Sequence, residues 1–445
     1  MKDNNITRRD FFKKTGAAAA AVTAVSMLPL RAQSSQSGKM TYRENPNNND
    51  KVSLLGYGCM RWQMTEDQQV NQESVNELVD KALASGINYF DTAPVYCRGL
   101  SETATGIALK RYPRDSYYIA TKLSSRGNSK AWPFEESKKM YLNSLKNLQT
   151  DYIDYYLLHS IGGEGSIERL QERFFDNKVI DFLLKEREAG RIRNLGFSFH
   201  GDTKLFNGML DQHDKVHWDF VQIQMNYIDW HHASASQNSD ILYNALAEKN
   251  IPVVIMEPLL GGRLASVPNH IAERLLEKEP TQSIASWAFR FCGTYPKVLT
   301  VLSGMTYMEH LEDNLKTFSP LKPLNEEELA FLDDTAELMA QYPIVGCTDC
   351  KYCMPCEYGI DIPSIFKHYN KCVNEGTMPE NDENYKKARR AFLIGYDRTV
   401  PRLRQADMCI ECRKCVSRCP QRINIPSELR KIDRFVEKLK QGKEL

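Results

Sequence analysis

The stretch GINYFDTAPVY, residues 86–96, decides the fold prediction. Its apolar run ends abruptly in the carboxylate of Asp91, and a proline and Tyr96 follow within five residues. This order is typical of a buried strand that leads into a loop with chemically active side chains. We therefore predict that Tyr96 is a proton donor just beyond the carboxyl end of a strand.

Similar apolar runs alternate with helix-length amphipathic segments from Lys51 onward. The eight runs are VSLLGYG, INYFDT, YYIATKL, IDYYLLH, RNLGFSFH, FVQIQMNY, PVVIMEP and VLTVLSG. Eight strand-helix units in about 270 residues indicate an α/β protein with a (β/α)8 TIM barrel. An open doubly wound sheet is the alternative, but its usual Gly-rich dinucleotide fingerprint is missing from GYGCM at 56–60. We expect the barrel to span residues 51–343.

Three helices are predicted from the spacing of apolar residues. The segment from Pro133 to Gln149 carries leucines at spacing three, which predicts one buried stripe. The stripe consists of Leu142, Leu145 and Leu148. Residues 167–189 and 325–342 are predicted as helices from their length and their alternation of charged and apolar residues.

The carboxyl ends of the predicted strands carry four polar side chains. Catalytic groups of TIM barrels come from these strand ends and the loops beyond them. The second run ends at Asp91 with Tyr96 beyond it, the third run holds Lys122 and the fourth ends at His159. The intervals are each about one strand-helix unit, so we expect the four side chains to share one rim.

These four residue types suit the reduction of a carbonyl group. A tyrosine with an ordinary pKa near 10 is a poor acid at neutral pH, and a neighbouring ammonium lowers that pKa. We expect Lys122 to do so, Asp91 to hold Lys122, and His159 to donate a hydrogen bond to the carbonyl oxygen. Each residue alone has an ordinary explanation, such as a solvated lysine or a helix cap. The ordered set indicates catalysis by Tyr96.

Residues from about 50 to 320 resemble the aldo-keto reductases. The motifs that carry this resemblance are FDTAPVY, SETATG, ATK, DYIDYYLLH, LGFSFHG, VQIQMNY and SGMTYMEHLEDN, in the family's order. The resemblance implies a catalytic tetrad of Tyr96, Asp91, Lys122 and His159. It also implies an NADPH molecule across the mouth of the barrel.

The resemblance also implies cofactor-binding residues. They are Ser198, Gln222, Gly261, Gly262, Gly304 and Asn314. Ser198 and Gln222 match positions that hold the nicotinamide amide, and the Gly pair lets backbone N–H groups approach a pyrophosphate. The sequence departs from the family at Phe199, where an asparagine is usual. The loop at 303–314 also lacks a cation for a 2′-phosphate. The choice between NADPH, NADH and no nicotinamide stays open.

Nine of the 12 cysteines lie between Cys347 and Cys419. Eight of them form the runs CTDCKYCMPC, residues 347–356, and CIECRKCVSRCP, residues 409–420, and Cys372 lies between the runs. Such tight spacing places thiolates around small inorganic cores and predicts two 4Fe-4S clusters. The predicted ligands are Cys347, Cys350, Cys353, Cys356, Cys409, Cys412, Cys415 and Cys419. Zinc normally takes two separated pairs, and disulfides would require external oxidation.

In two-cluster ferredoxins the fourth cysteine of each run ligates the other cluster. This rule groups Cys419 with the first three cysteines of the first run, and Cys356 with the first three of the second. DIPSIFKHY after Cys356 is echoed by INIPSELRKIDRF after Cys419. We therefore predict a mainly helical ferredoxin-like domain over residues 344–445, with an internal duplication.

The N-terminus, residues 1–33, resembles a twin-arginine signal peptide. Arg8 and Arg9 precede two phenylalanines and Lys13, and an alanine-rich apolar run follows. This run is shorter than the about 20 residues that span a bilayer. Because such signals export folded proteins, we expect the twin-arginine machinery to carry the chain to the periplasm or another exported location. Residues 34–50 are predicted as a linker with a short hairpin around Thr41–Arg43.

The charge composition narrows the range of possible partners. The chain has 445 residues and 58 Lys+Arg against 57 Asp+Glu, a net charge of +1. This balance gives no reason to expect a nucleic-acid partner. We predict an exported iron-sulfur oxidoreductase that interconverts a small carbonyl and its alcohol, with a redox partner protein left open. The alternative is a non-enzymatic electron-transfer or binding protein on the same scaffold.

Overall fold

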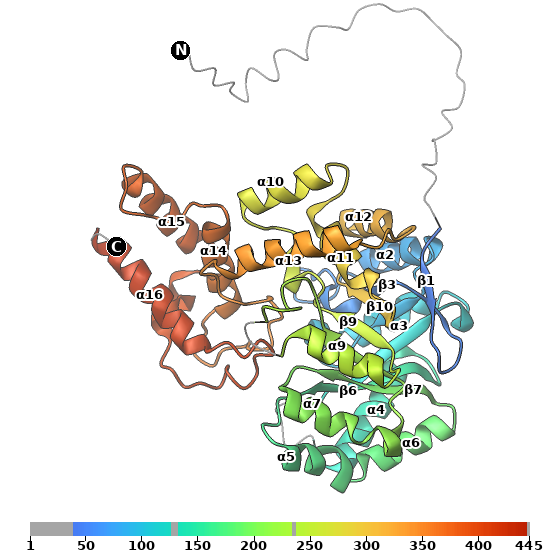
Figure 1. Cartoon of the computed structure of the whole chain (residues 1–445). Helices are drawn as coiled ribbons and strands as arrows, with labels where there is room; N and C mark the ends of the chain where they lie inside the picture. The colour runs from blue at the N-terminus through green and yellow to red at the C-terminus, as the bar shows by residue number, and fades with distance from the viewer. Residues whose placement is uncertain (1–38, 126–131, 234–236, 443–445) are drawn as a thin grey trace, which may run out of the picture. The chain divides into compact units, whose positions relative to one another are not determined.

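The eight apolar runs form the strands of a closed parallel barrel in the computed structural model of the chain (Figure 1). The structure describes residues 39–125, 132–233 and 237–442. Each strand pairs with its neighbours along the chain, and the last closes on the first. The strands are β3 (Leu55–Gly58), β4 (Tyr89–Asp91), β5 (Tyr118–Leu123), β6 (Ile153–Ile161), β7 (Ile192–Phe199), β8 (Phe220–Gln224), β9 (Val253–Met256) and β10 (Val298–Ser303). The predicted (β/α)8 barrel is confirmed.

The barrel is stable because both faces of its strands are apolar. All nine residues of β6 are buried, as expected for a parallel strand covered on both sides. Alternate residues fill the barrel itself. The ring of Tyr155 lies 5.0 Å from that of Tyr89 and 5.1 Å from that of Phe220. The mouth of the barrel is therefore supported by a packed interior.

Helices surround the strands (Figure 1). They are α2 (Gln72–Ala84), α3 (Ser101–Leu109), α4 (Phe134–Leu148), α5 (Ile167–Gln171), α6 (Val179–Glu188), α7 (Thr203–Leu210), α8 (His213–Val216), α9 (Ser239–Glu248), α10 (Asn269–Lys278), α11 (Ile284–Thr294), α12 (Met308–Phe318) and α13 (Glu326–Ala340). The helix predicted over 167–189 is interrupted by a π-helical turn and by Lys178, whose φ is 63°. The helix predicted over 325–342 is α13, which begins with a capping box formed by Asn325 and Glu328.

The predicted stripe on α4 is partly wrong. Leu142 is 50% exposed, whereas Tyr141 is fully buried. The buried positions follow spacings of four and three, through Ser137, Tyr141, Ser144 and Leu148. A helix turns by about 100° per residue, so Leu142 is rotated away from the line through Tyr141.

The predicted short hairpin is present before the barrel. β1 (Tyr42–Glu44) pairs antiparallel with β2 (Lys51–Ser53). Arg43 of β1 donates to the backbone oxygens of Gly293, Tyr295 and Val298. The part of the predicted linker from β1 onward is thus bonded to the barrel rather than extended between domains.

The region after α13 has a core of its own. It contains α14 (Ile362–Asn374), α15 (Tyr385–Thr399) and α16 (Ile425–Gln441). Their buried residues form one apolar cluster between Val345 and Leu439, and Tyr342 and Ile344 pack against it. Both α14 and α16 begin with an Ile-Pro pair, as the predicted duplication requires. The region is mainly helical, as expected.

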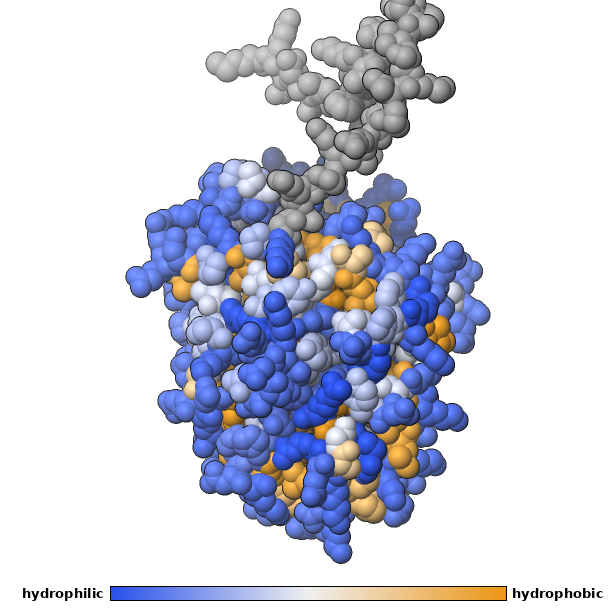
Figure 2. All heavy atoms as spheres, turned by 90° about the vertical axis from the view of Figure 1, so that its right-hand side faces the viewer, coloured by the Kyte–Doolittle hydropathy of each residue, from blue (hydrophilic) through white to orange (hydrophobic). Residues whose placement is uncertain are grey.

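The predicted signal peptide lies outside the described residues. Among the residues that the structure does describe, no helix combines the length and apolar character needed to cross a bilayer. Figure 2 shows one face of the molecule, where hydrophilic side chains predominate and hydrophobic ones form smaller groups between them.

Candidate active site and cysteine sets

The four residues of the predicted tetrad meet at the carboxyl end of the barrel. Asp91 ends β4, Lys122 lies on β5 and His159 on β6, while Tyr96 begins a short 3-10 turn after β4. The exposed fraction of each residue is 8% or less. The Nζ of Lys122 lies 2.5 Å from Oδ1 of Asp91 and donates to the carbonyl oxygen of Thr92 at 2.8 Å. The lysine is therefore held as expected.

Tyr96 lies between the lysine and the histidine. The Nζ of Lys122 is 4.9 Å from the centre of the Tyr96 ring, and the ring of His159 stands edge-on to it at 5.9 Å. Nδ1 of His159 lies 2.5 Å from the hydroxyl oxygen of Ser124, which fixes the orientation of the imidazole. The geometry suits an acid and a hydrogen-bond donor that act on the same oxygen.

The expected lowering of the Tyr96 pKa is wrong for this structure. Burial raises the pKa of Tyr96 well above its ordinary value, and the neighbouring Tyr352 raises it further. Burial also lowers the pKa of Lys122 and raises that of Asp91, each opposed by the charge of the other. The desolvation of the phenolate outweighs the attraction of the ammonium. Tyr96 is consequently held in its protonated form.

Tyr352 reaches the tetrad from the first cysteine run. It lies between Cys350 and Cys353 in the sequence, and its ring is edge-on to that of His159 at 6.4 Å. Its hydroxyl forms a hydrogen bond with that of Tyr96. Tyr352 therefore connects the cysteine region directly to the predicted acid.

Further contacts hold the first cysteine run on the barrel. The guanidinium of Arg61, just after β3, donates to the carbonyl oxygen of Thr348 at 2.7 Å. A Cβ on Gly261 would lie only 2.1 Å from the same oxygen, so this turn accepts no side chain. Burial raises the pKa of Glu257 at the end of β9, and Arg61 opposes the shift. A partly buried carboxyl group thus lies against the run.

The second cysteine run also contacts the barrel. The side-chain amide of Gln421, which is 6% exposed, donates to Gln224 of β8 at 2.9 Å. Gln224 in turn donates to Asp229 at 2.6 Å. Arg422 donates to the carbonyl oxygen of Gly162 at 3.4 Å. Side chains in the first run and directly after the second run therefore contact the mouth of the barrel.

Two of the residues implied for nicotinamide binding form hydrogen bonds within the chain. Ser198 accepts a hydrogen bond from the N–H of Ser160 at 2.7 Å, and Asn314 donates to Ser303 at 2.9 Å. Gln222 is 2% exposed and its carbonyl oxygen has no partner among the described residues. Gly304 faces the side chain of Arg61, and Gly262 has open space where a Cβ would be. Gln222 thus keeps an acceptor for an amide.

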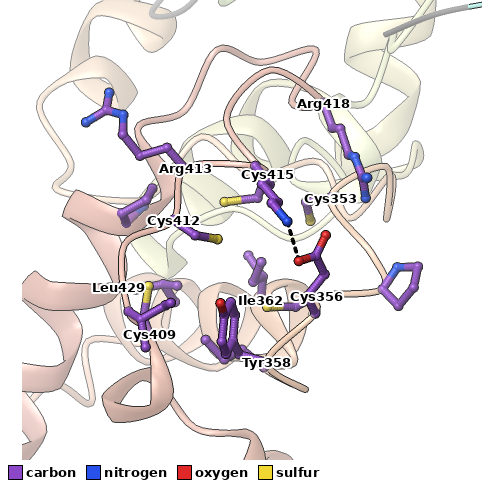
Figure 3. A pocket seen from close by; sticks show the side chains of 16 residues that line it. Cys353, Cys356, Tyr358, Ile362, Cys409, Cys412, Arg413, Cys415, Arg418 and Leu429 are labelled. Carbon is purple, nitrogen blue, oxygen red and sulfur yellow. Dashed lines mark hydrogen bonds and ion pairs between the residues drawn. The ribbon is translucent and has the colours of Figure 1, made fainter. Parts of the chain in front are cut away.

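The eight cysteines separate into two sets. The inner set lines one pocket and consists of Cys347, Cys350, Cys353 and Cys419. The outer set lines a second pocket and consists of Cys356, Cys409, Cys412 and Cys415, and Cys353 of the inner set lies between the two pockets and lines both. Figure 3 shows the outer cysteines around the second pocket. Each set takes three cysteines from one run and one from the other, which is the predicted grouping.

Both sets fit 4Fe-4S clusters. Each provides four thiol groups around one space, the ligand number of such a cluster. Burial raises the pKa of Cys350 to about 12 and that of Cys415 to about 11, so binding of a metal centre is needed to hold these groups as thiolates. Among the described side chains, no three His, Cys, Asp or Glu residues converge on a single-ion site.

Sequence reasoning did not identify Tyr352, Arg61, Glu257 or Gln421. Tyr352 stands among cluster ligands, Arg61 in a loop, and Gln421 directly after a Cys-Pro pair. Their roles depend on contacts between distant parts of the chain. The only available signal was the position of Glu257 just beyond a predicted strand.

Comparisons with known proteins agree with the division into a barrel and a C-terminal cysteine-containing region. Residues 54–337 match the model of the aldo/keto reductase family, and residues 346–425 match a 4Fe-4S dicluster domain. L-galactose dehydrogenase of Arabidopsis thaliana is 26% identical over 305 residues, which cover 65% of this chain and 92% of that protein. The uncharacterized oxidoreductase YqkF of Bacillus subtilis is 25% identical, with 63% and 92% covered.

Solved structures show the same barrel. The holo form of aldo-keto reductase AKR11C1 from Bacillus halodurans has a TM-score of 0.54 and 25% identity, covering 66% of this chain and 96% of that one. An aldo-keto reductase from Klebsiella pneumoniae in complex with NADPH has a TM-score of 0.51 and 22% identity, covering 68% and 95%. The second likeness shows the fold alone.

Proposed function

Because this chain belongs to the aldo/keto reductase family, we propose that it is an exported oxidoreductase that interconverts a small carbonyl and its alcohol at Tyr96. The observation that carries this proposal is the convergence of Tyr96, Lys122 and His159 on one buried point. The C-terminal 4Fe-4S dicluster domain supplies one-electron transfers when its clusters are bound.

Reduction of a carbonyl to an alcohol consumes two electrons and two protons. Tyr96 delivers one proton, to the carbonyl oxygen, because burial keeps its hydroxyl protonated. His159, anchored by Ser124, donates a hydrogen bond to the same oxygen as negative charge develops there. Lys122 stabilises the phenolate of Tyr96 after proton transfer, from a position that Asp91 holds.

Tyr352 forms one wall of this reaction space. Its hydroxyl is hydrogen-bonded to that of Tyr96, the group that a substrate carbonyl oxygen would contact. A substrate must therefore take the place of this hydroxyl or displace it. Tyr352 thereby places the inner set next to the reacting oxygen.

NADP(H) remains a candidate two-electron carrier. The unpartnered oxygen of Gln222 suits an amide, and relatives with this fold include an enzyme in complex with NADPH. The Gly261 turn, however, is packed on Thr348, so a pyrophosphate cannot lie on that side of the turn while the first run is in place.

Export by the twin-arginine route is supported by the paired arginines and the alanine-rich run at the N-terminus. A chain that needs eight cysteine ligands assembled before use benefits from a route that transports folded proteins. Fractionation of cells that express the full chain tests this, with an Arg8→Lys and Arg9→Lys double variant as the matched control. Recovery of both forms in the cytoplasm would contradict export.

Anaerobic purification tests the enzymatic proposal. We expect about eight irons per chain and turnover of a panel of aldehydes and sugars with a chemical reductant. The Tyr96→Phe variant should keep its iron and lose turnover. Equal turnover by both forms would remove Tyr96 from the reaction.

A second candidate is a non-enzymatic electron-transfer or binding protein. The observation that favours it is the hydroxyl of Tyr352 at the acid itself, which fills the place of a substrate oxygen. This candidate predicts full iron content, no bound nicotinamide and no turnover of any carbonyl, even in a Tyr352→Ala variant. Stoichiometric nicotinamide in the purified protein would support the enzyme.

A further inference from the structure

The surface beside the outer set carries exposed apolar side chains. Leu403 is 76% exposed and Ile410 is 59% exposed, the two highest values among the large hydrophobic residues that the structure describes. Ile410 lines the outer pocket together with Cys412, which is the one exposed cysteine among the described residues. Apolar side chains at such exposure are typical of surfaces that bind another molecule.

Leu403 lies close to the same pocket. The guanidinium of its neighbour Arg404 donates to the carbonyl oxygen of Gly359 at 3.2 Å, and the N–H of Asp361 donates to the carbonyl oxygen of Arg404 at 3.0 Å. Gly359 follows Cys356 by three residues. The segment with Leu403 is therefore attached to the loop that leaves the outer set.

Two arginines add positive charge to this surface. Arg413 and Arg418 line the outer pocket and are exposed, and among the described residues neither has a carboxylate partner. The neighbouring Lys414 is paired with Glu357 at 2.5 Å, a bond drawn in Figure 3. We call Leu403, Ile410, Arg413 and Arg418 the outer patch. Its uncompensated charge is positive.

The arginines do not simply neutralise the cysteine thiolates. Figure 3 shows the guanidinium group of Arg413 pointing away from the sulfur of Cys412. A group directed to solvent acts on an approaching molecule more than on the pocket behind it. The patch therefore combines exposed apolar side chains with cationic groups that are unpaired within the described residues, near Cys412, the exposed ligand.

We propose that the outer patch is the docking surface for an acidic one-electron carrier protein, such as a ferredoxin or a flavodoxin. This inference rests on the proposed function, and it adds the class of partner and the point of electron entry. Each encounter transfers one electron, so two reduced carriers are each oxidised once for every carbonyl reduced. Two protons complete the alcohol: Tyr96 delivers one to the oxygen, and solvent water supplies the other, which ends on the carbon together with the two electrons. Complementary charge would steer the encounter, as is usual for transient redox complexes.

Binding measurements with defined probes test this inference on the full, cluster-loaded chain. The probes are an acidic two-cluster ferredoxin, an acidic flavodoxin and, as the opposite charge, a basic cytochrome c. We expect at least one acidic probe to bind, more weakly as salt rises. The Arg413→Glu and Arg418→Glu double variant should weaken this binding about tenfold or more. A Leu403→Ala and Ile410→Ala variant should weaken it with little change in salt dependence.

A matched control changes the same charge elsewhere. Lys81→Glu and Lys139→Glu, both exposed on barrel helices, should leave probe binding within about twofold of the unchanged chain. Binding and turnover with a chemical reductant are expressed per iron-loaded chain, and on that basis turnover should be the same in every variant. Loss of turnover with the chemical reductant would count against the proposed function, whereas loss of carrier binding alone concerns the docking surface.

Three results would overturn the inference. The first is binding of the cytochrome c as tight as that of the acidic probes. The second is an effect of the patch reversal no larger than that of the control. The third is capture of the chain by vesicles of phosphatidylglycerol in preference to both acidic probes, because that would assign the patch to an anionic lipid surface.

Discussion

The two cysteine sets are alike in chemistry and opposite in surroundings. Three cysteines of the inner set come from the first run, which is held on the barrel. In this run Tyr352 contacts the tetrad, and the backbone of Thr348 accepts a hydrogen bond from Arg61 and packs on Gly261. The outer set includes the exposed Cys412 and lies beside exposed Leu403 and Ile410. Of the two similar cysteine sets, the inner one thus lies next to the predicted reaction site and the outer one lies at the surface.

The difference comes from the residues around the cysteines. Tyr352 follows Cys350 by two residues, and Tyr358 follows Cys356 by two. Tyr352 reaches Tyr96 and His159, whereas Tyr358 is 45% exposed. The same residue at the same interval therefore acts as an active-site wall in one set and as a surface group in the other.

The strongest test removes the acid that only the inner set touches. Tyr96→Phe should lower turnover by about 10²–10⁴-fold, the usual contribution of a positioned acid. Iron content should not change, because Tyr96 ligates nothing. Turnover of each accepted carbonyl, measured beside iron per chain, gives the answer. A fall of less than tenfold would place the proton donor elsewhere.

The paired tyrosines test the comparison itself. Tyr352→Ala should change kcat/KM with a chemical reductant by about tenfold, since it removes a wall and a hydrogen-bond partner of Tyr96. Tyr358→Ala is the matched control and should change it by less than twofold. Steady-state kinetics on one aldehyde suffice. Equal effects would mean that the two sets are not functionally distinct.

The pH dependence separates the hydroxyl of Tyr352 from its ring. Tyr96 donates a proton only while protonated, and its raised pKa preserves reduction as pH rises until that pKa is passed. Tyr352→Phe removes one contribution that raises the pKa, so the alkaline fall in rate should begin at lower pH. Burial, the larger cause, remains. An alkaline limb that stays in place or moves upward would show that the hydrogen bond has no such role.

The smallest expected effects concern stability. Arg61→Ala should lower the free energy of unfolding by about 1 kcal/mol, because it removes a charge-assisted hydrogen bond to Thr348. Arg430→Ala removes the exposed pair with Glu411 near the outer set and should cost at most about 0.5 kcal/mol. Denaturant unfolding of the two variants under anaerobic conditions measures the difference. A larger cost for Arg430→Ala would reverse the comparison.

Local patterns in the sequence were enough to predict the barrel and the cysteine grouping. Each strand is an unbroken apolar run, and the position of Asp91 or His159 at a strand end follows from that run alone. The cysteine grouping follows from the rule for two-cluster ferredoxins, in which the fourth cysteine of each run ligates the other cluster.

Contacts between the barrel and the C-terminal region could not be predicted. Nothing near Tyr352 in the sequence specifies Tyr96 as its partner, and the same holds for Gln421 and Gln224, which are 197 positions apart. The raised pKa of Tyr96 could not be predicted for the same reason, since Tyr352 contributes to it. On α4, the regular leucine spacing predicted a buried Leu142, whereas the buried side chain on that turn of the helix is Tyr141.

The exchange of the fourth cysteine between the runs has a consequence for biosynthesis. Three inner ligands emerge from the ribosome with the first run, but the fourth, Cys419, emerges only after α14 and α15. A nascent or truncated chain that stops before Cys419 has a finished barrel and an incomplete inner set. The second run therefore completes the site nearest to the tetrad, so that assembly of the inner set reports that both runs have been synthesised.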